Sequence, residues 1–216
     1  MTLSTNTLGI LYANITYSED VKNSLGVWLV GQRVAQMIFV ISEAIHKHGG
    51  IVSNTFDDAV LGTFTNADST FKTATEIISL QVDALDTTQT EIPLDLRIAL
   101  NYGKMYVAAG NISGNEINLV LQLVKKADVG QVIATSALVE ALSDDLKSHT
   151  SNIGVVRLES INEDVDIYNV SLDITSDTDR ELAIKTVVIP PPVKKKKKVK
   201  KKKKQKVQPV GKKKIL

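Results

Sequence analysis

The densest group of charged side chains in this sequence is a run of lysines close to its end. Residues 194–216 contain 14 lysines and no acidic residue. Such a run is attracted to anionic membranes by about 1 kcal/mol per lysine near the surface. It also binds nucleic acid with salt-dependent, sequence-blind affinity. The run has no aromatic residue on which a base could stack, so sequence-specific readout is not expected. The predicted polyanion-binding residues are Lys194, Lys195, Lys196, Lys197, Lys198, Lys200, Lys201, Lys202, Lys203 and Lys204.

The rest of the chain carries the opposite charge. The sequence has 26 Lys and Arg, so removing the 14 lysines of the run leaves 12 basic residues against 24 Asp and Glu. A body with this excess of acids is not expected to bind nucleic acid. The lysine run could also fold back on the acidic body. Its target therefore stays open among an anionic membrane, nucleic acid, an acidic protein and the body itself.

Other reactive chemistry is sparse. The chain has no cysteine, which excludes disulfides and thiol catalysis. His46 and His48 stand at the predicted end of a helix, where histidines more often cap carbonyls than bind metals, and His149 is isolated. Serine, histidine and aspartate occur without a nucleophile-elbow motif. Residues 110–114 lack the Gly-Lys-Ser/Thr of a phosphate-binding loop and are interpreted as a turn.

Apolar periodicity predicts an α+β sandwich, with helices packed on a mixed sheet. In a helix over residues 24–47, one apolar stripe is formed by Val34, Met37, Ile38, Ile41 and Ile45. Gly49 and Gly50 end that helix. The other expected helices cover residues 67–85, 115–126 and 136–143. The expected strands cover residues 8–15, 51–53, 59–64, 94–100, 104–109, 131–134, 154–158 and 166–171, with a turn at 101–103. Tyr12, Trp28 and Phe39 are expected to be core or dimer contacts.

Composition divides the sequence into three parts. Residues 1–172 carry the apolar periodicity of a folded domain. Residues 173–193 are interpreted as a linker, in which Pro190, Pro191 and Pro192 enforce an extended stretch. Residues 194–216 are a low-complexity lysine tail that cannot bury a core and is expected to be disordered when free.

The segment Leu8-Gly9-Ile10-Leu11-Tyr12-Ala13-Asn14-Ile15 resembles the first strand of the class III adenylate/guanylate cyclase catalytic domain. That strand reads roughly apolar-Phe-Ala-Asp-Ile. Further similar segments follow in the order of that family, at residues 48–52, 55–58, 97–103, 114–119 and 130–133. The resemblance covers about residues 8–171. It implies a ferredoxin-like mixed sheet, ATP or GTP as ligand, and a homodimer or a heterodimer with another cyclase-type domain.

In the family that this chain resembles, two carboxylates hold two metal ions that cyclise the nucleotide. The resemblance places the first carboxylate position at Asn14 and the second at Asp58. Asp57, beside it, is either a substitute charge or an exposed turn acid. A neutral amide at Asn14 removes one negative charge from the pair, and magnesium prefers anionic oxygen ligands. Mg²⁺ or Mn²⁺ is therefore expected only if nucleotide binding is retained, and no other cofactor is implied.

The family's other half-site is a helix that carries Asn-x-x-x-Arg, and here these positions fall on Asn118 and Gln122. Glutamine lacks the charged, planar fork that pairs with phosphate oxygens. Losing such a donor costs about 10²–10³ in rate, by analogy with oxyanion-hole deletions. The purine-selecting positions fall on Asn54 and Asn111, which reproduce neither a recognised adenine pair nor a guanine pair. The choice between ATP and GTP therefore stays open.

Both half-sites depart from the family pattern, so we interpret the chain as a degenerate nucleotide cyclase. In this interpretation it is a dimerising signalling or scaffold module that the lysine tail anchors to a polyanion. The alternative is a weakly active adenylate or guanylate cyclase that uses Asp57, Asp58 and a partner chain. We expect a cytoplasmic protein, peripheral on an anionic membrane surface. Residues 1–6 carry no secretory signal, and residues 27–45 are too polar to span a bilayer.

Overall fold

The structure, a computed structural model, describes residues 4–87, 94–108, 111–158 and 161–171. Its strands are β1 (Ser4–Thr16), β2 (Ile51–Thr55), β3 (Ala59–Phe64), β4 (Asp95–Ala108), β5 (Asn111–Ser113), β6 (Val132–Thr135), β7 (Thr150–Leu158) and β8 (Glu163–Val170). Its helices are α1 (Glu19–Leu25), α2 (Val27–Lys47), α3 (Ala67–Thr87), α4 (Asn115–Leu123), a 3₁₀ turn (Val124–Lys126), α5 (Ser136–Ala141) and α6 (Asp144–Lys147).

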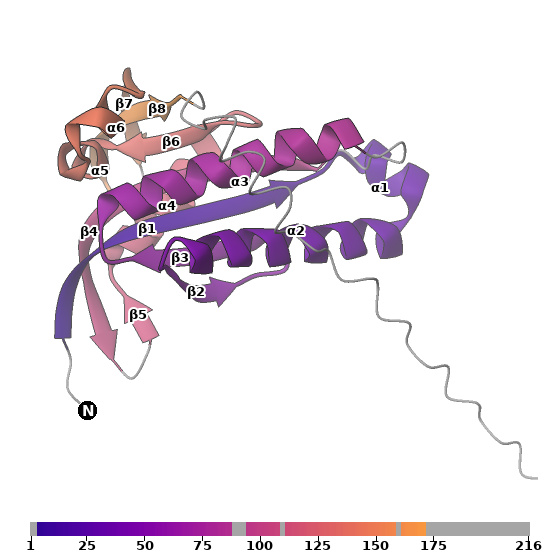
Figure 1. The fold of residues 1–216 in the computed structure, drawn as a ribbon, viewed down its shortest axis with the longest axis horizontal. Helices are drawn as coiled ribbons and strands as arrows, with labels where there is room; N and C mark the ends of the chain where they lie inside the picture. The colour runs from indigo at the N-terminus through magenta and orange to yellow at the C-terminus, as the bar shows by residue number, and fades with distance from the viewer. Residues whose placement is uncertain (1–3, 88–93, 109–110, 159–160, 172–216) are drawn as a thin grey trace, which may run out of the picture.

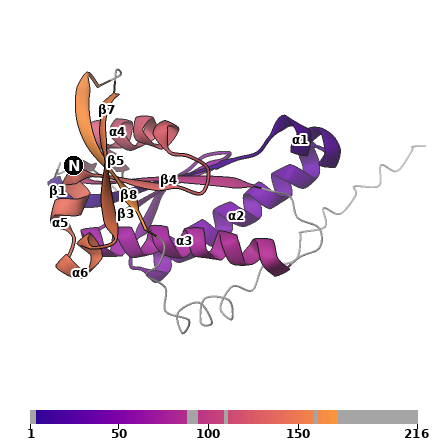
Figure 2. The same ribbon diagram turned by 90° about the horizontal axis from the view of Figure 1, so that it is seen from above.

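Within these residues the strands form one mixed sheet, in the order β2-β3-β1-β4-β6-β8-β7, with β5 paired to β4. The β4–β6 pair is parallel and the other pairs are antiparallel. Helices α2, α3 and α5 cover one face of the sheet, and α4 covers the other (Figure 1 and Figure 2). The predicted α+β architecture is confirmed.

Strand β1 lies in the middle of the sheet and is buried on both faces. Leu11, Ala13 and Ile15 point into the core under α2 and α3, whereas Ile10 and Tyr12 point into the core under α4. This alternation follows from the two-residue period of a strand. It places Asn14 on the same face of the sheet as Tyr12, toward α4.

The helix predicted for residues 24–47 is interrupted near its start. Gly26, with φ +80°, separates α1 from α2, and the two helices meet at a bend of 116°. The predicted apolar stripe of α2 is confirmed, because Val34, Ile41 and Ile45 are buried and Met37 and Ile38 pack against them. In the part of the chain that the structure describes, no single helix is long and apolar enough to cross a membrane. The bent α1–α2 pair meets that criterion by length and composition alone.

The expected turn at residues 101–103 is wrong, because β4 runs through it without a break. Asn101 is 1% exposed, and its amide donates to Glu116 Oε2 at 2.5 Å while its Oδ1 accepts from Thr135 Oγ1 at 2.6 Å. These tertiary partners satisfy the polar side chain that would otherwise favour a turn. Gly103 pairs with Leu8 of β1, so the local turn signal is overridden by the ladder.

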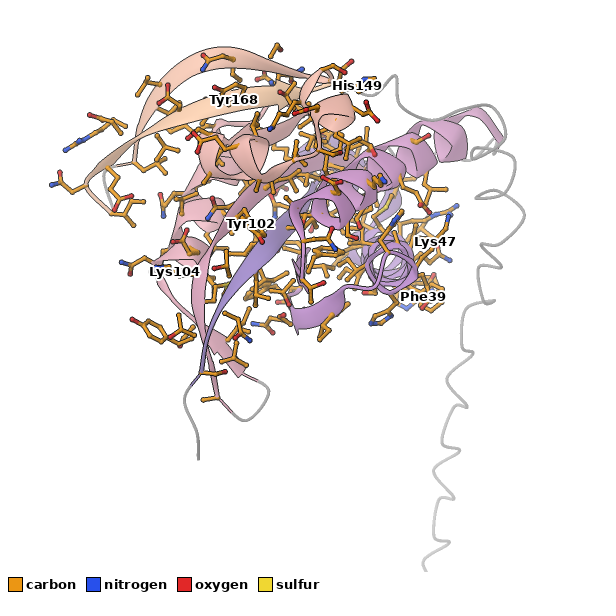
Figure 3. All side chains as sticks on the ribbon, turned by 60° about the vertical axis from the view of Figure 1, so that its left-hand side comes forward. Phe39, Lys47, Tyr102, Lys104, His149 and Tyr168 are labelled. Atoms are coloured by element: carbon orange, nitrogen blue, oxygen red, sulfur yellow. The ribbon has the colours of Figure 1, made fainter. Side chains whose placement is uncertain are left out.

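Two further expectations need correction. Part of the segment 110–114, which was interpreted as a turn, forms the short strand β5 on the β4 edge. Trp28 and Phe39 are exposed to 75% and 41%, so the core alternative is wrong for them and the dimer contact stays a prediction, whereas Tyr12 is a core residue. Figure 3 shows Phe39 and Lys47 on the side of α2 that points away from the sheet.

Candidate functional site

The β2–β3 hairpin brings Asp58 to the end of β1, beside Asn14. The backbone N–H of Ile15 donates to the carbonyl oxygen of Asp58 at 2.7 Å, and Asn14 Nδ2 approaches the same oxygen at 3.4 Å. Across the hairpin, the N–H of Phe56 donates to Ala59 O at 2.8 Å. Asn14 and Asp58, which are far apart in the sequence, therefore meet at one end of the sheet.

Tyr12 lies two residues before Asn14 on the same face of β1. Burial, and then the negative charge of Asp58, raise the pKa of the Tyr12 hydroxyl above its ordinary value. The Tyr12 ring packs edge-on against Phe56, with ring centroids 6.0 Å apart. The hydroxyl is therefore neutral at physiological pH and close enough to Asp58 for its charge to act.

Arg97 on β4 lies directly opposite Asn14 in the β1–β4 register. Because Ala99 of β4 packs in the core under α4, Arg97 also projects to that face. Its Nε is buried and has no hydrogen-bond acceptor among the described residues. A neutral amide therefore faces a half-buried guanidinium at the position where the cyclase strand carries a carboxylate.

The donors at this end of the sheet do not suit a pair of divalent cations. Asp57 and Asp58 are exposed neighbours on the hairpin, and Asn14 contributes a neutral oxygen. Residues 4–87, 94–108, 111–158 and 161–171 contain no group of three or more His, Asp or Glu placed to hold a metal ion. The positive charge of the Arg97 guanidinium, opposite Asn14, would repel a metal cation bound there.

The second predicted half-site lies on α4. Its Leu119, Val120 and Leu123 are buried, so the helix is fixed against β1 and β4 by its apolar side. Asn118 is exposed and Gln122 is half-buried, and the i, i+4 spacing places them on one side of the helix. Neither forms a hydrogen bond to Asn14 or Asp58 in the described residues. Within one chain the two half-sites are thus separate.

The N-terminal turn of α4 is tied to the sheet by Glu116. Its carboxylate accepts the hydrogen bond from Asn101 and lies over Gly103, where an added Cβ would be 2.5 Å from Glu116 Cδ. Thr135, which donates to Asn101, also caps α5 by accepting the N–H of Leu138 at 3.3 Å. This chain of hydrogen bonds ties the start of α4, the helix that carries Asn118 and Gln122, to β4 and β6.

The two predicted purine-selecting residues lie on different elements. Asn54 is exposed on β2, after an irregularity in the β2–β3 register, and its Oδ1 accepts the N–H of Thr55 at 2.9 Å. Asn111 opens β5, where its backbone pairs with Ala108. The linker 173–193 and the predicted polyanion-binding residues Lys194–Lys204 lie outside the described residues.

Lys47 and His48, at the end of α2, form an ion cluster with Glu76 of α3. Glu76 of α3 receives His48 Nε2 at 2.7 Å and Lys47 Nζ at 2.9 Å. Burial alone would raise the pKa of Glu76, but the hydrogen bonds and charges of His48 and Lys47 outweigh it and lower that pKa. The cluster joins two helices and has the character of a structural ion pair.

The sequence matches no protein-family model and no curated protein. Solved structures do match it. An adenylate/guanylate cyclase/hydrolase from Silicibacter pomeroyi is 21% identical, with 80% of this chain and 100% of that chain covered, at a TM-score of 0.67. The adenylyl cyclase CyaB from P. aeruginosa is 16% identical over 83% and 99%, at 0.65. An adenylate cyclase from Trypanosoma brucei, solved in a monomeric state, is 15% identical over 76% and 89%, at 0.64.

The fold is that of class III adenylate/guanylate cyclase catalytic domains. This confirms the resemblance on which the sequence prediction was based.

Sequence reasoning missed Arg97 as a residue of the site. The residue lies inside the segment 97–103 that resembles the cyclase family, but no motif assigns it a role. Its relation to Asn14 depends on the register of two strands that are more than 80 residues apart in sequence. A charged residue inside an otherwise apolar strand was the available signal.

Proposed function

We propose that this chain is a cyclase-fold domain that has lost nucleotide cyclisation and serves as a dimerising signalling or scaffold module. The observation that carries the proposal is Asn14, a neutral side chain opposite Arg97, where the two-metal chemistry needs a carboxylate. Gln122 removes the phosphate-binding cation from the other half-site. Because each half-site lacks a charge, a second copy of this chain does not restore either one.

The test is a cyclic-nucleotide assay on the purified chain, with ATP or GTP and with Mg²⁺ or Mn²⁺. We expect no cAMP or cGMP above a buffer blank. The double variant Asn14→Asp with Gln122→Arg should gain turnover, and adding Asp58→Ala to it should remove that gain. Wild-type turnover well above the blank, abolished by Asp58→Ala, would falsify the proposal and establish a weak cyclase.

Nucleotide binding without turnover is a separate part of the proposal. Asp58 and Asn118 are both exposed and remain open to a ligand. Calorimetry with ATP and GTP, with and without Mn²⁺, measures this directly. A heat of binding that Asp58→Ala or Asn118→Ala reduces supports a nucleotide-sensing module, and no heat under any condition leaves only the scaffold role.

Dimerisation through α4 and the β2–β3 turn is the third part. The apolar Leu119, Val120 and Leu123 are used by the chain's own core, so a partner would meet Asn118, Gln122 and the exposed Phe56. In sedimentation velocity, Phe56→Glu should weaken a dimer. Ile51→Glu, on the same hairpin and more exposed, is the matched control. A wild-type chain that stays monomeric at high concentration contradicts this part.

The lysine tail is proposed to hold this module on a polyanion. Fourteen lysines with no acidic residue among them attract a polyanion to the tail. The rest of the chain has an excess of acidic residues, so it is not expected to add to this attraction. Attachment to an anionic membrane makes the protein peripheral on the cytoplasmic face.

A further inference from the structure

The corner between α1 and α2, residues 23–32, exposes large apolar side chains. Trp28 is 75% exposed, Val27 70% and Leu25 37%. Soluble proteins seldom expose such side chains together unless a partner covers them. Tyr17, just before α1, is also exposed, to 38%. In Figure 1 the corner projects beyond the end of the sheet.

The exposure follows from the backbone at Gly26. Its positive φ turns the chain into α2, which buries Val30 and Val34 on its inner side. Trp28 lies on the outer side of that helix, and Val27 is exposed because it is the first residue of α2. Helix α1 buries none of its residues. Covering each large side chain would gain about 1.5–3 kcal/mol. The described residues provide nothing that covers them.

The corner is also uncharged. No residue from Asn23 to Gln32 carries a charge. The charged residues just before the corner are Glu19, Asp20 and Lys22. Lys22 pairs with Glu19 at 3.2 Å. Beyond the corner, Arg33 donates to Gln36 at 3.2 Å. A neutral, apolar tip that carries tryptophan is suited to the boundary between lipid headgroups and acyl chains.

Strand β8, the last described strand before the lysine run, ends on the same side of the sheet as β1. Strand β4 is antiparallel to β1, β6 is parallel to β4, and β8 is antiparallel to β6. Strands β1 and β8 therefore end on the same side, one leading into α1 and the other into residues 172–216. Three strand spacings, about 14 Å, separate the two strands across the sheet. The register places Asn169 of β8 level with Tyr12, so β8 ends a few residues before β1 does. The 22 residues from 172 to 193 can span several times that distance.

We propose that the α1–α2 corner inserts Leu25, Val27 and Trp28 into the interface of an anionic lipid surface, beside the lysine tail. This rests on the proposed attachment of the tail to a polyanion and commits that polyanion to lipid. One weak apolar contact or one basic segment binds membranes reversibly, whereas the two together give stable attachment. A nucleic acid would engage the lysines and leave the apolar corner exposed.

Trp28 is the only tryptophan of the chain, so its fluorescence reports on the corner alone. Full-length protein is titrated with vesicles of phosphatidylcholine containing phosphatidylserine, and with phosphatidylcholine alone. With the anionic vesicles we expect a blue shift of the emission, and quenching by lipids brominated along the acyl chain. Val27→Ser with Trp28→Ser should weaken vesicle binding, measured by co-sedimentation, by tenfold or more.

Phe39→Ser is the matched control, because Phe39 is an exposed apolar residue of the same helix outside the corner. It should bind vesicles as the wild type does. All of these side chains are exposed, so the variants should keep the wild-type melting temperature. If the variant with Trp28→Ser melts at a lower temperature, Trp28→Tyr is tested in its place.

A second variant separates this inference from the proposed role of the tail. Replacing Lys194–Lys198 and Lys200–Lys204 with glutamine in the full chain should weaken binding to anionic vesicles. If this variant loses binding while Val27→Ser with Trp28→Ser retains it, the tail attachment stands and the corner inference is overturned. If neither change affects binding, both are overturned. A blue shift that depends on protein concentration, without vesicles, would instead make the corner an interface between copies and overturn the lipid proposal.

Discussion

Arg97 lies directly opposite Asn14 across the β1–β4 pair, and its buried Nε has no acceptor in the described part of the chain. A buried donor without an acceptor costs about 1–3 kcal/mol. The pair therefore destabilises the fold where a carboxylate at position 14 would have offered an anionic acceptor.

This relationship predicts that Arg97→Met stabilises the protein by about 1 kcal/mol, because the unpaired donor is removed and the aliphatic packing is kept. Urea unfolding of the two proteins measures the difference. Arg157→Met is the control, since Arg157 is exposed and pairs with Asp164 at 3.1 Å. Loss of this exposed ion pair should destabilise the protein only slightly. A loss of stability in Arg97→Met would mean that the guanidinium has an unseen partner.

Gly103→Ala is predicted to destabilise the fold by about 1–3 kcal/mol. The new Cβ would lie 2.5 Å from Glu116 Cδ, and Glu116 is held in place by Asn101. In a Glu116→Ala background the same substitution should cost much less. Gly31→Ala, in the second turn of α2 where an added Cβ meets open space, is a control of opposite sign and should stabilise by about 0.5–1 kcal/mol. Equal costs for Gly103→Ala in both backgrounds would contradict the contact.

The sequence was sufficient for elements whose pattern is local. The stripe of α2 and the doubly buried β1 follow from apolar periodicity, and the structure has both. Local signals failed where distant residues decide. Asn101 and Gly103 have turn chemistry, yet Glu116 and Thr135 satisfy Asn101 and keep β4 continuous.

The candidate site was predictable to a similar extent. The resemblance indicated Asn14 and Asp58, and the structure brings them together. Arg97 could not be assigned, because only strand register places it opposite Asn14. Trp28 was expected in a core or a dimer contact on apolarity alone, but whether an apolar helix residue faces inward depends on the break at Gly26.

The ion cluster of Glu76, His48 and Lys47 predicts that the free energy of unfolding falls when the pH is lowered into the acidic range. The pKa of Glu76 is lowered in the folded state, so the folded protein holds the carboxylate charged more strongly than the unfolded chain does. Its stabilising contribution is therefore complete above the ordinary pKa of about 4.5 and is lost as pH falls through the lower folded value.

Glu76→Gln should accordingly destabilise the protein at pH 7 and have a smaller effect at pH 3, as measured by urea unfolding at both values. Glu43→Gln is the control, because Glu43 is exposed and lies 4.0 Å from His46. It should change stability little at either pH. A Glu76→Gln effect that is the same at pH 3 and pH 7 would show that packing, and not charge, accounts for the loss.

The lysine tail predicts polyanion binding that is steep in salt and indifferent to sequence. Counterions released from a segment of 14 lysines should make the affinity for duplex DNA and for anionic vesicles fall by at least about 10³ between ~50 and ~200 mM salt. The full chain with glutamine at residues 194–198 and 200–204 should lose most of this binding. Lys125→Gln with Lys126→Gln removes two exposed lysines of the body and should keep it. Equal binding by the tail variant and the wild type, or no binding by either at low salt, would make the tail a partner of the acidic body. In that case the tail variant should also unfold at a lower temperature.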